Sequence, residues 1–215
     1  MFAPFKFAPW PLIAVIFFFS VVIHEVAHGV VASKCGDDTA KLMGRITLNP
    51  IAHIDLFGTI LVPILMYSMG GFIIGWAKPV PVNPLNFKNF RGDTMKVGAS
   101  GPLTNFALAV IFTFLLWIIN FLNMASDRIG FSVCAVLASG VTINLILGLF
   151  NLTPIPPLDG SRIISSLLPM QLSQKYDSIA PFGFFILIFV LGFIWPVILG
   201  LANTMYKVLF WGIPV

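Results

Sequence analysis

The sequence predicts an all-α polytopic membrane protein with about four full transmembrane helices and one re-entrant or broken element. Hydrophobic residues make up 58% of its 215 residues and charged residues only 9%, whereas an ordinary soluble domain carries about 25% charge. Several apolar runs are also long enough to cross a bilayer, which takes about 20 residues each. We therefore expect one membrane-embedded domain, residues 1–215, and no long soluble domain beside it.

Four apolar stretches are predicted to cross the membrane completely. The first starts at the interfacial pair Trp10-Pro11, and the third ends at the proline-rich break that follows Asn151. The last comes after a polar stretch. The four predicted spans cover residues 10–34, 97–122, 131–150 and 181–203.

The connection between the first two spans is irregular. Residues 35–55 are polar and read as a loop. Residues 56–76 are apolar, but one proline and four glycines interrupt them, which favours a broken or re-entrant element over a straight span. Three prolines in residues 79–84 favour extended backbone, and short β-strands are an option between residues 40 and 90.

The box His24-Glu25-Val26-Ala27-His28 lies inside the first span. Residues four apart share a face of a helix, so His24 and His28 can both present a ring nitrogen to one cation. Glu25, the only glutamate of the chain, lies beside that face, where it could take a proton from a metal-bound water. Ionisable residues inside a span are costly, which favours chemistry over the alternative of polar side chains that merely pack together.

The pattern leaves several candidates for the third ligand. A catalytic zinc ion typically has three protein ligands, and two histidines leave one missing. Asp159 is favoured because a proline-broken helix end precedes it and Gly160 follows it, so the chain can turn a carboxylate back into the interior. A loop-capping aspartate is the open alternative. The other candidates are His53, Asp55 and Asp93, and Asp37, Asp38, Asp127 and Asp177, which look like surface residues.

Topology bears on this choice through residues 56–76. If they cross the membrane fully, His28 and Asp159 fall on opposite sides. If they enter and leave on one face, the two residues share a side, and the positive charges divide nine against three between the faces instead of five against seven. Cytoplasmic loops carry an excess of Lys and Arg. The uneven division favours the re-entrant element and places the candidate site toward the cytosol.

The chain resembles the site-2 protease family of intramembrane zinc metalloproteases through three motifs in order. These are the box at His24–His28, then Gly101-Pro102-Leu103-Thr104-Asn105, then the run NLTPIPPLDG at Asn151–Gly160. Residues 49–55 and 75–84 are similar to the compact prokaryotic branch, which lacks PDZ and CBS domains. The resemblance implies a prokaryotic plasma-membrane protein with a catalytic core at about residues 10–165 and an accessory helix at 181–203.

The resemblance also implies the roles of the site residues. His24, His28 and Asp159 would bind one Zn²⁺ per chain, and Glu25 would be the general base. Asn151 would act near the substrate or the oxyanion, and Asn105 would be structural. The implied reaction is hydrolysis of peptide bonds in or near a transmembrane segment of another membrane protein. The net charge of +4 is spread over loops, so the expected partners are this substrate and the bilayer, with no nucleic acid.

Some readings stay open. His53 is either a modulator near the site or a hydrogen-bonded loop histidine. The region 70–84 is either a rigid connector or an edge or gate that holds an extended substrate. A di-iron histidine-box oxidase needs more histidines than the three present. A transporter-like or chaperone-like membrane protein with a structural metal site is the alternative function.

Overall fold

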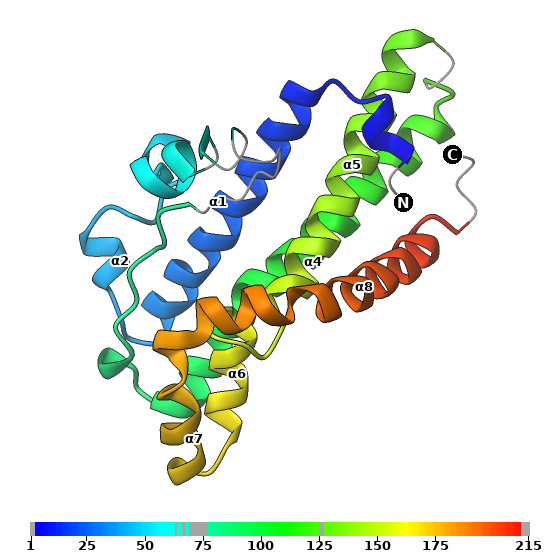
Figure 1. Ribbon diagram of the computed structural model, residues 1–215. Helices are drawn as coiled ribbons and strands as arrows, with labels where there is room; N and C mark the ends of the chain where they lie inside the picture. The colour runs from blue at the N-terminus through cyan, green and yellow to red at the C-terminus, as the bar shows by residue number, and fades with distance from the viewer. Residues whose placement is uncertain (1–2, 63, 66–67, 69–76, 125–126, 212–215) are drawn as a thin grey trace.

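Four long helices dominate the computed structural model, which describes residues 3–62, 64–65, 68, 77–124 and 127–211 (Figure 1). Each is long and apolar enough to cross a membrane, which confirms the four predicted spans. The second begins before its apolar run because the Asn89 side chain caps it and accepts the Gly92 N–H at 3.1 Å. The four helices are α1 (Trp10–Lys34), α4 (Phe90–Phe121), α5 (Arg128–Asn151) and α8 (Gly183–Leu209).

Shorter helical elements connect these spans. Those that follow α5, and the first and last of those that follow α1, lie at the end of the bundle where α1 ends, whereas the cyan helix at Leu56–Leu61 lies beside α1 itself (Figure 1). The short elements are η1 (Ala3–Lys6), α2 (Thr39–Leu42), η2 (Pro50–His53), η3 (Leu56–Leu61), η4 (Pro84–Asn86), α6 (Asp159–Leu167), α7 (Met170–Asp177) and η5 (Ala180–Phe182).

The predicted option of short β-strands between residues 40 and 90 is wrong for the described part of that range. Residues 77–83 form no regular element, and several of their backbone groups bind side chains instead of a neighbouring strand. Two prolines among them have no N–H to offer a β-ladder. We call Lys78–Asn83 the strap. It descends beside α1 toward η4 (Figure 1).

Most of the predicted re-entrant element, residues 56–76, lies outside the described residues. The chain on either side of it is described, and the two sides meet: the Lys78 N–H donates to the His53 carbonyl at 2.9 Å. A single full crossing would separate them by about 30 Å of hydrocarbon. The chain therefore leaves and returns at the same level of the molecule, as the re-entrant prediction requires.

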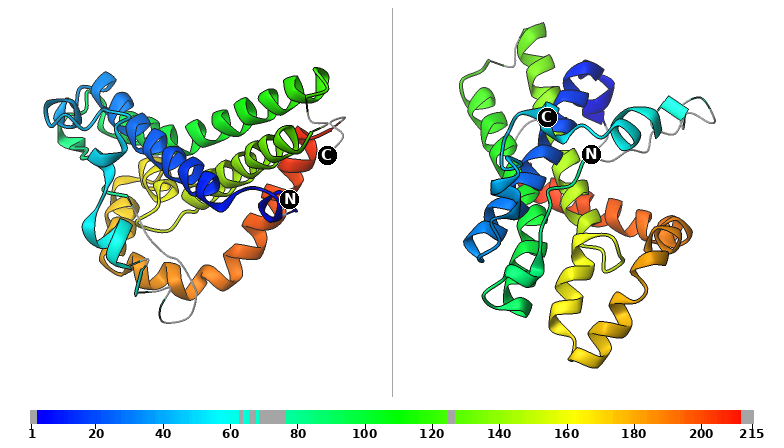
Figure 2. Two further views of the ribbon diagram at one scale, coloured as in Figure 1. Left: turned by 90° about the horizontal axis from the view of Figure 1, so that it is seen from above. Right: turned by 90° about the vertical axis from the view of Figure 1, so that its left-hand side faces the viewer.

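The α4 helix is central to the packing. It lies against α1, α5 and α6, while α8 packs on α5 (Figure 2). Small residues allow close approach, since a Cβ on Gly140 would lie 3.0 Å from the Phe112 ring. The α4 helix thereby touches both α1 and α6, which carry the candidate ligands. The buried apolar core comes from α4, α5, α8 and the residue after α8: Ala109, Leu116, Ala138, Val141, Leu145, Ala202, Tyr206 and Phe210.

Candidate metal centre

The three predicted ligands His24, His28 and Asp159 come together between α1 and the start of α6. Asp159 Oδ2 lies 3.0 Å from His24 Nε2 and 3.1 Å from His28 Nε2, and the two Nε2 atoms lie 3.1 Å apart. All three residues are buried. Within the described ranges, they form the one group of His, Cys, Asp and Glu side chains that could hold a metal ion.

The hydrogen bond of His28 fixes its tautomer. Its Nδ1 lies 2.7 Å from the Val97 carbonyl oxygen in α4, and a carbonyl can only accept, so Nδ1 carries the proton. The Ser100 hydroxyl donates to the same carbonyl at 2.7 Å and lies 3.2 Å from Nδ1. In the neutral ring, Nε2 is then a lone pair directed at the other two ligands.

The tautomer of His24 is set by a longer chain of buried groups. The Gly140 carbonyl can only accept, so the Asn144 amide nitrogen donates to it at 2.9 Å. Asn144 Oδ1 then accepts from Asn105 Nδ2 at 2.9 Å, which leaves Asn105 Oδ1 to accept from His24 Nδ1 at 2.6 Å. Asn105 and Asn144 are both fully buried. The Gly140 carbonyl thus sets the orientation of both asparagine amides, and these place the proton of His24 on Nδ1. The lone pair on His24 Nε2 is then free for a metal.

Three acceptor groups therefore converge in one buried space. Two imidazole lone pairs and a carboxylate oxygen repel one another unless a cation lies among them. Two histidine nitrogens and one carboxylate oxygen are a ligand set of catalytic zinc sites. The residues fit a zinc ion.

Asp159 reaches the histidines because the chain turns sharply before α6. A Cβ on Gly160 would lie 2.1 Å from the Leu152 carbonyl oxygen, so only glycine fits after Asp159. A Cβ on Gly98 of α4 would lie 3.2 Å from the Asp159 carbonyl oxygen, which shows how closely α6 approaches α4. Asp159 also lies in the first turn of α6, where the helix dipole favours a negative charge.

One face of α4 supports both histidines. Val97, Gly101 and Asn105 are four residues apart and share this face. A Cβ on Gly101 would lie 2.5 Å from His24 Nε2 and 2.6 Å from His28 Nε2. Gly101 therefore leaves the space that the two rings occupy, while the residues one turn before and after it orient them.

Glu25 lies on the neighbouring face of α1 and points to the strap. Its Oε2 accepts the Val80 N–H at 2.9 Å. It does not belong to the group of candidate metal ligands among the described residues. The box thus directs both His24 and His28 at Asp159, as their spacing predicted, while Glu25 binds the strap.

Two other predicted site residues lie in separate surroundings. Asn151 ends α5, and its amide donates to the Leu147 carbonyl at 3.0 Å along the same helix. His53 is fully buried, with Nε2 donating to the Thr47 carbonyl at 2.9 Å. These contacts leave the proposed roles of Asn151 and His53 as predictions.

Four residues around the site were missed or misjudged from the sequence. Asn144 and Gly101 received no role, and Asn105, expected to be structural, bonds directly to a ligand histidine. The signal for the asparagines was an amide inside an apolar span, where polar groups need partners. Asp37, which looked like a surface residue, is fully buried, because the strap folds over it and the Asn83 N–H donates to it at 2.7 Å.

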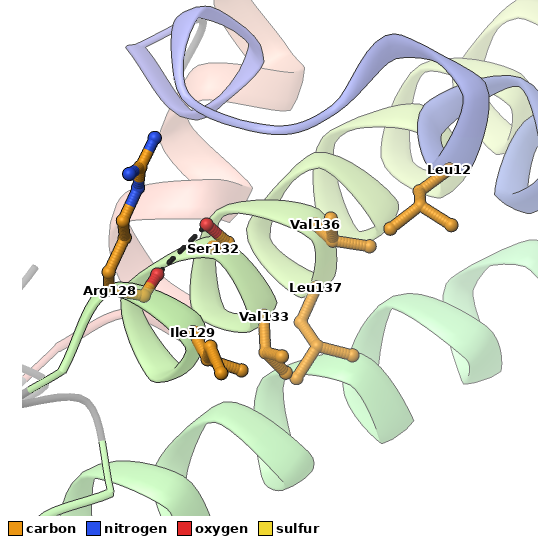
Figure 3. Close-up of a pocket in the computed structure, with 7 residues that line it drawn as sticks. All are labelled: Leu12, Arg128, Ile129, Ser132, Val133, Val136 and Leu137. Atoms are coloured by element: carbon orange, nitrogen blue, oxygen red, sulfur yellow. Dashed lines mark hydrogen bonds between the residues drawn. The ribbon is translucent and has the colours of Figure 1, made fainter.

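An apolar pocket lies at the opposite end of α1 from the histidines (Figure 3). The Arg128 guanidinium points away from the other lining side chains, and the Ser132 hydroxyl donates to the Arg128 carbonyl at 3.0 Å. Leu12 is about 18 Å along the helix from His24 at 1.5 Å per residue. This pocket is therefore separate from the candidate metal centre. It is lined by Leu12, Arg128, Ile129, Ser132, Val133, Val136 and Leu137.

Comparison with known proteins points to the same chemistry. The model of the family described as "Peptidase family M50" matches residues 12–191. The Bacillus subtilis protein named "Putative zinc metalloprotease YwhC" is 40% identical over 221 residues, covering 96% of this chain and 94% of that protein. "Zinc metalloprotease MJ0392" of Methanocaldococcus jannaschii is 27% identical over 167 residues, covering 78% of this chain and 36% of that protein. No solved structure gives a significant match.

Proposed function

The chain belongs to peptidase family M50, the zinc metallopeptidases of the site-2 protease type, and we propose that Glu25 is its general base and a membrane-protein segment its substrate. The observation that carries the proposal is the separation of roles on α1. His24 and His28 face Asp159, whereas Glu25, one residue on, stands beside them without joining the ligand group within the described residues.

The chain's own residues divide the work of hydrolysis. His24, His28 and Asp159 would hold one zinc ion per chain, which would polarise the scissile carbonyl and make the attacking water more acidic. Glu25 takes the proton of the attacking water and returns it to the leaving amine. Such proton transfer by a positioned group contributes about 10²- to 10⁴-fold to rate. Asn151, whose amide donates to the Leu147 carbonyl within α5, would turn from this bond to supply a second donor to the oxyanion.

The substrate is a transmembrane or membrane-buried segment of another protein. The ligand-bearing α1 is a candidate membrane span, so the peptide bond must reach a site within the bilayer. A helical segment hides its carbonyls in its own hydrogen bonds and has to unwind locally before attack. These requirements favour substrates whose spans contain helix-weakening residues such as glycine and proline.

The site faces the cytosol of a prokaryotic cell. The meeting of the His53 carbonyl and the Lys78 N–H supports the topology in which nine of the twelve Lys and Arg residues share one face. Leu42 and Leu85 lie on that face and are 85% and 86% exposed, and Ile129 on the other face is 73% exposed. Cysteines placed there, with Cys35 and Cys134 replaced, should react with a membrane-impermeant maleimide from opposite sides. Labelling of all three from one side contradicts this topology.

Cleavage assays with Glu25→Gln test the function. A panel of single-span reporter proteins is presented to the enzyme in proteoliposomes. The parent should cleave at least one reporter, and Glu25→Gln should retain zinc and cleave about 10²- to 10⁴-fold more slowly. Asp127→Asn is the control, because asparagine also caps the distant N-terminus of α5.

Two results would count against the proposal. Cleavage by Glu25→Gln at the parent rate excludes the glutamate base. Zinc binding with no cleavage of any reporter favours the alternative of a non-proteolytic membrane protein with a structural metal. Substrate trapping with Glu25→Gln in native membranes would then show whether any spanning segment is enriched.

A further inference from the structure

The strap directs one backbone N–H, that of Val80, at Glu25 of α1. Pro79 and Pro81 have no N–H, so Val80 carries the only one in Pro79-Val80-Pro81. That N–H donates to Glu25 Oε2 at 2.9 Å. Among the described residues, Oε2 is the one Glu25 oxygen with a hydrogen-bond donor, which leaves Oε1 to face other groups.

The strap is seated on α1 by a glycine. Gly29 and Glu25 are four residues apart and share a face of α1, next to the face of the two histidines. A Cβ on Gly29 would lie 3.0 Å from Val80 Cγ1 and 3.2 Å from Ile46 Cγ1. Val80 is buried in this seat. Its side chain and its N–H thus contact successive turns of the same helix face.

An arginine holds the strap from the other direction. The Arg45 guanidinium donates to the carbonyls of Lys78 and Pro79, at 2.9 and 3.3 Å. Arg45 is only 9% exposed, and its Nε–H is buried without a hydrogen-bond partner in the described structure. Burying a guanidinium with an unused donor costs free energy. The two hydrogen bonds to the strap carbonyls are what Arg45 gains in exchange for this burial.

We propose that Arg45 and the Pro79-Val80-Pro81 segment are positioning elements that orient the general base Glu25 through the Val80 N–H. The flanking prolines restrict the backbone of Val80 before folding, so little conformational freedom is lost when its N–H is directed at the carboxylate. Arg45 fixes the two preceding carbonyls and therefore the plane of the peptide that carries this N–H. The inference rests on the proposed role of Glu25 as the base.

Hydrogen exchange tests the contact without any substrate. In the parent, the Val80 amide should exchange slowly, and in Glu25→Ala it should exchange at the rate of a free extended amide. Lys78 and Asn83 should keep their protection, since their N–H groups bond to His53 and Asp37. Fast exchange at Val80 in the parent overturns the proposal, whatever the protein cleaves.

Proline substitution tests the effect on catalysis. Val80→Pro removes both the valine side chain and the backbone N–H. Val80→Ala also removes the valine side chain but keeps the backbone N–H. We expect kcat of Val80→Pro to be about 10- to 100-fold below that of Val80→Ala, the size expected for a misplaced catalytic group, with KM and zinc content alike in the two. Val82→Pro is the control for a further proline in the strap. Equal or higher kcat in Val80→Pro overturns the proposal, because the bond would then be dispensable or would hold Glu25 back.

Arg45 gives a second variant that leaves the strap sequence intact. Arg45→Met should lower kcat and speed exchange at Val80 with zinc retained, and Arg45→Lys should recover part of both. The exposed Arg91, replaced by Met, is the matched control. An Arg45→Met protein that keeps the parent kcat, or that loses zinc together with activity, overturns the role of Arg45. If neither the parent nor any variant cleaves a reporter, the proposed function fails while the exchange experiment still decides the contact.

Discussion

His24 and Glu25 are neighbours in the chain, yet two different kinds of structure hold them. His24 is fixed by side-chain amides buried among α1, α4 and α5. Glu25 is held by one backbone N–H from the strap. The contacts of His24 depend on close packing of membrane-spanning helices, which a bilayer favours. The contacts of the strap are hydrogen bonds to the side chains of Arg45, Glu25 and Asp37. A metal site and its base can therefore be perturbed separately, and the variants below test that separation from the largest expected effect to the smallest.

Gly101→Ala should have the largest effect. The added Cβ would lie 2.5 Å from His24 Nε2, so both rings have to move and the α4 backbone cannot yield easily. We expect metal affinity to fall by more than about 100-fold, measured by metal analysis after dialysis against graded chelator. Gly192→Ala in α8 is the control, since a Cβ there meets nothing within 4 Å. Full zinc content in Gly101→Ala would contradict the described packing.

Asn105→Leu should have the next largest effect on metal affinity. Leucine fills the space but leaves the His24 Nδ1–H and the side-chain oxygen of Asn144 without these partners in a buried position. Loss of a group that orients a ligand histidine costs about 10- to 100-fold in metal affinity. Asn144→Leu, one step further from the ring, should cost less. Ser139→Ala is the control, because among the described residues this buried hydroxyl of α5 bonds within its own helix, to the Ala135 carbonyl. Equal affinities in all three would show that the amide chain does not act on His24.

Gly29→Ala is the counterpart of Gly101→Ala on the strap face. Its Cβ would lie 3.0 Å from Val80 Cγ1, the end of a side chain in a segment that can shift. We expect zinc content to stay at the parent level and kcat to fall by about threefold to tenfold as the Val80 N–H moves from Glu25. A loss of zinc similar to that of Gly101→Ala would mean that the two faces of α1 are not independent.

Asp37→Asn should have the smallest effect, and it depends on pH. Burial would raise the pKa of Asp37, but hydrogen bonds from Thr39, Asn83 and Asn86 outweigh it and lower this pKa. A carboxyl with a lowered pKa stabilises the fold above its unfolded pKa of about 3.9, and this contribution is lost as pH falls through the folded value. Thermal unfolding measured from about pH 6 to about pH 3 spans that pKa. As pH falls, Asp37→Asn should lose less stability than the parent. Identical pH profiles would show that the Asp37 carboxylate does not stabilise the fold through its bond to the strap.

The four spans and the pair His24 and His28 could be predicted because they depend on the length of apolar runs and on helical period. Asp159 was only favoured, by the proline-broken helix end and by the charge division between the faces, and a loop-capping aspartate stayed open. The strap was not predictable in this way. Its contacts join Arg45, Glu25 and Asp37 to a segment up to 55 residues away, and no periodicity links them. The burial of Asp37 and the bond from Asn105 to His24 likewise depend on how separate helices pack.

The central claim is that three residues hold the metal and Glu25 does not. X-ray absorption at the zinc edge, combined with cleavage of a reporter, tests it most directly in the parent and in Glu25→Gln. We predict the same zinc environment in both proteins, with two imidazoles and a carboxylate oxygen, and cleavage in the parent alone. A zinc environment that loses an oxygen ligand in Glu25→Gln, or cleavage that persists in that variant, would contradict the account.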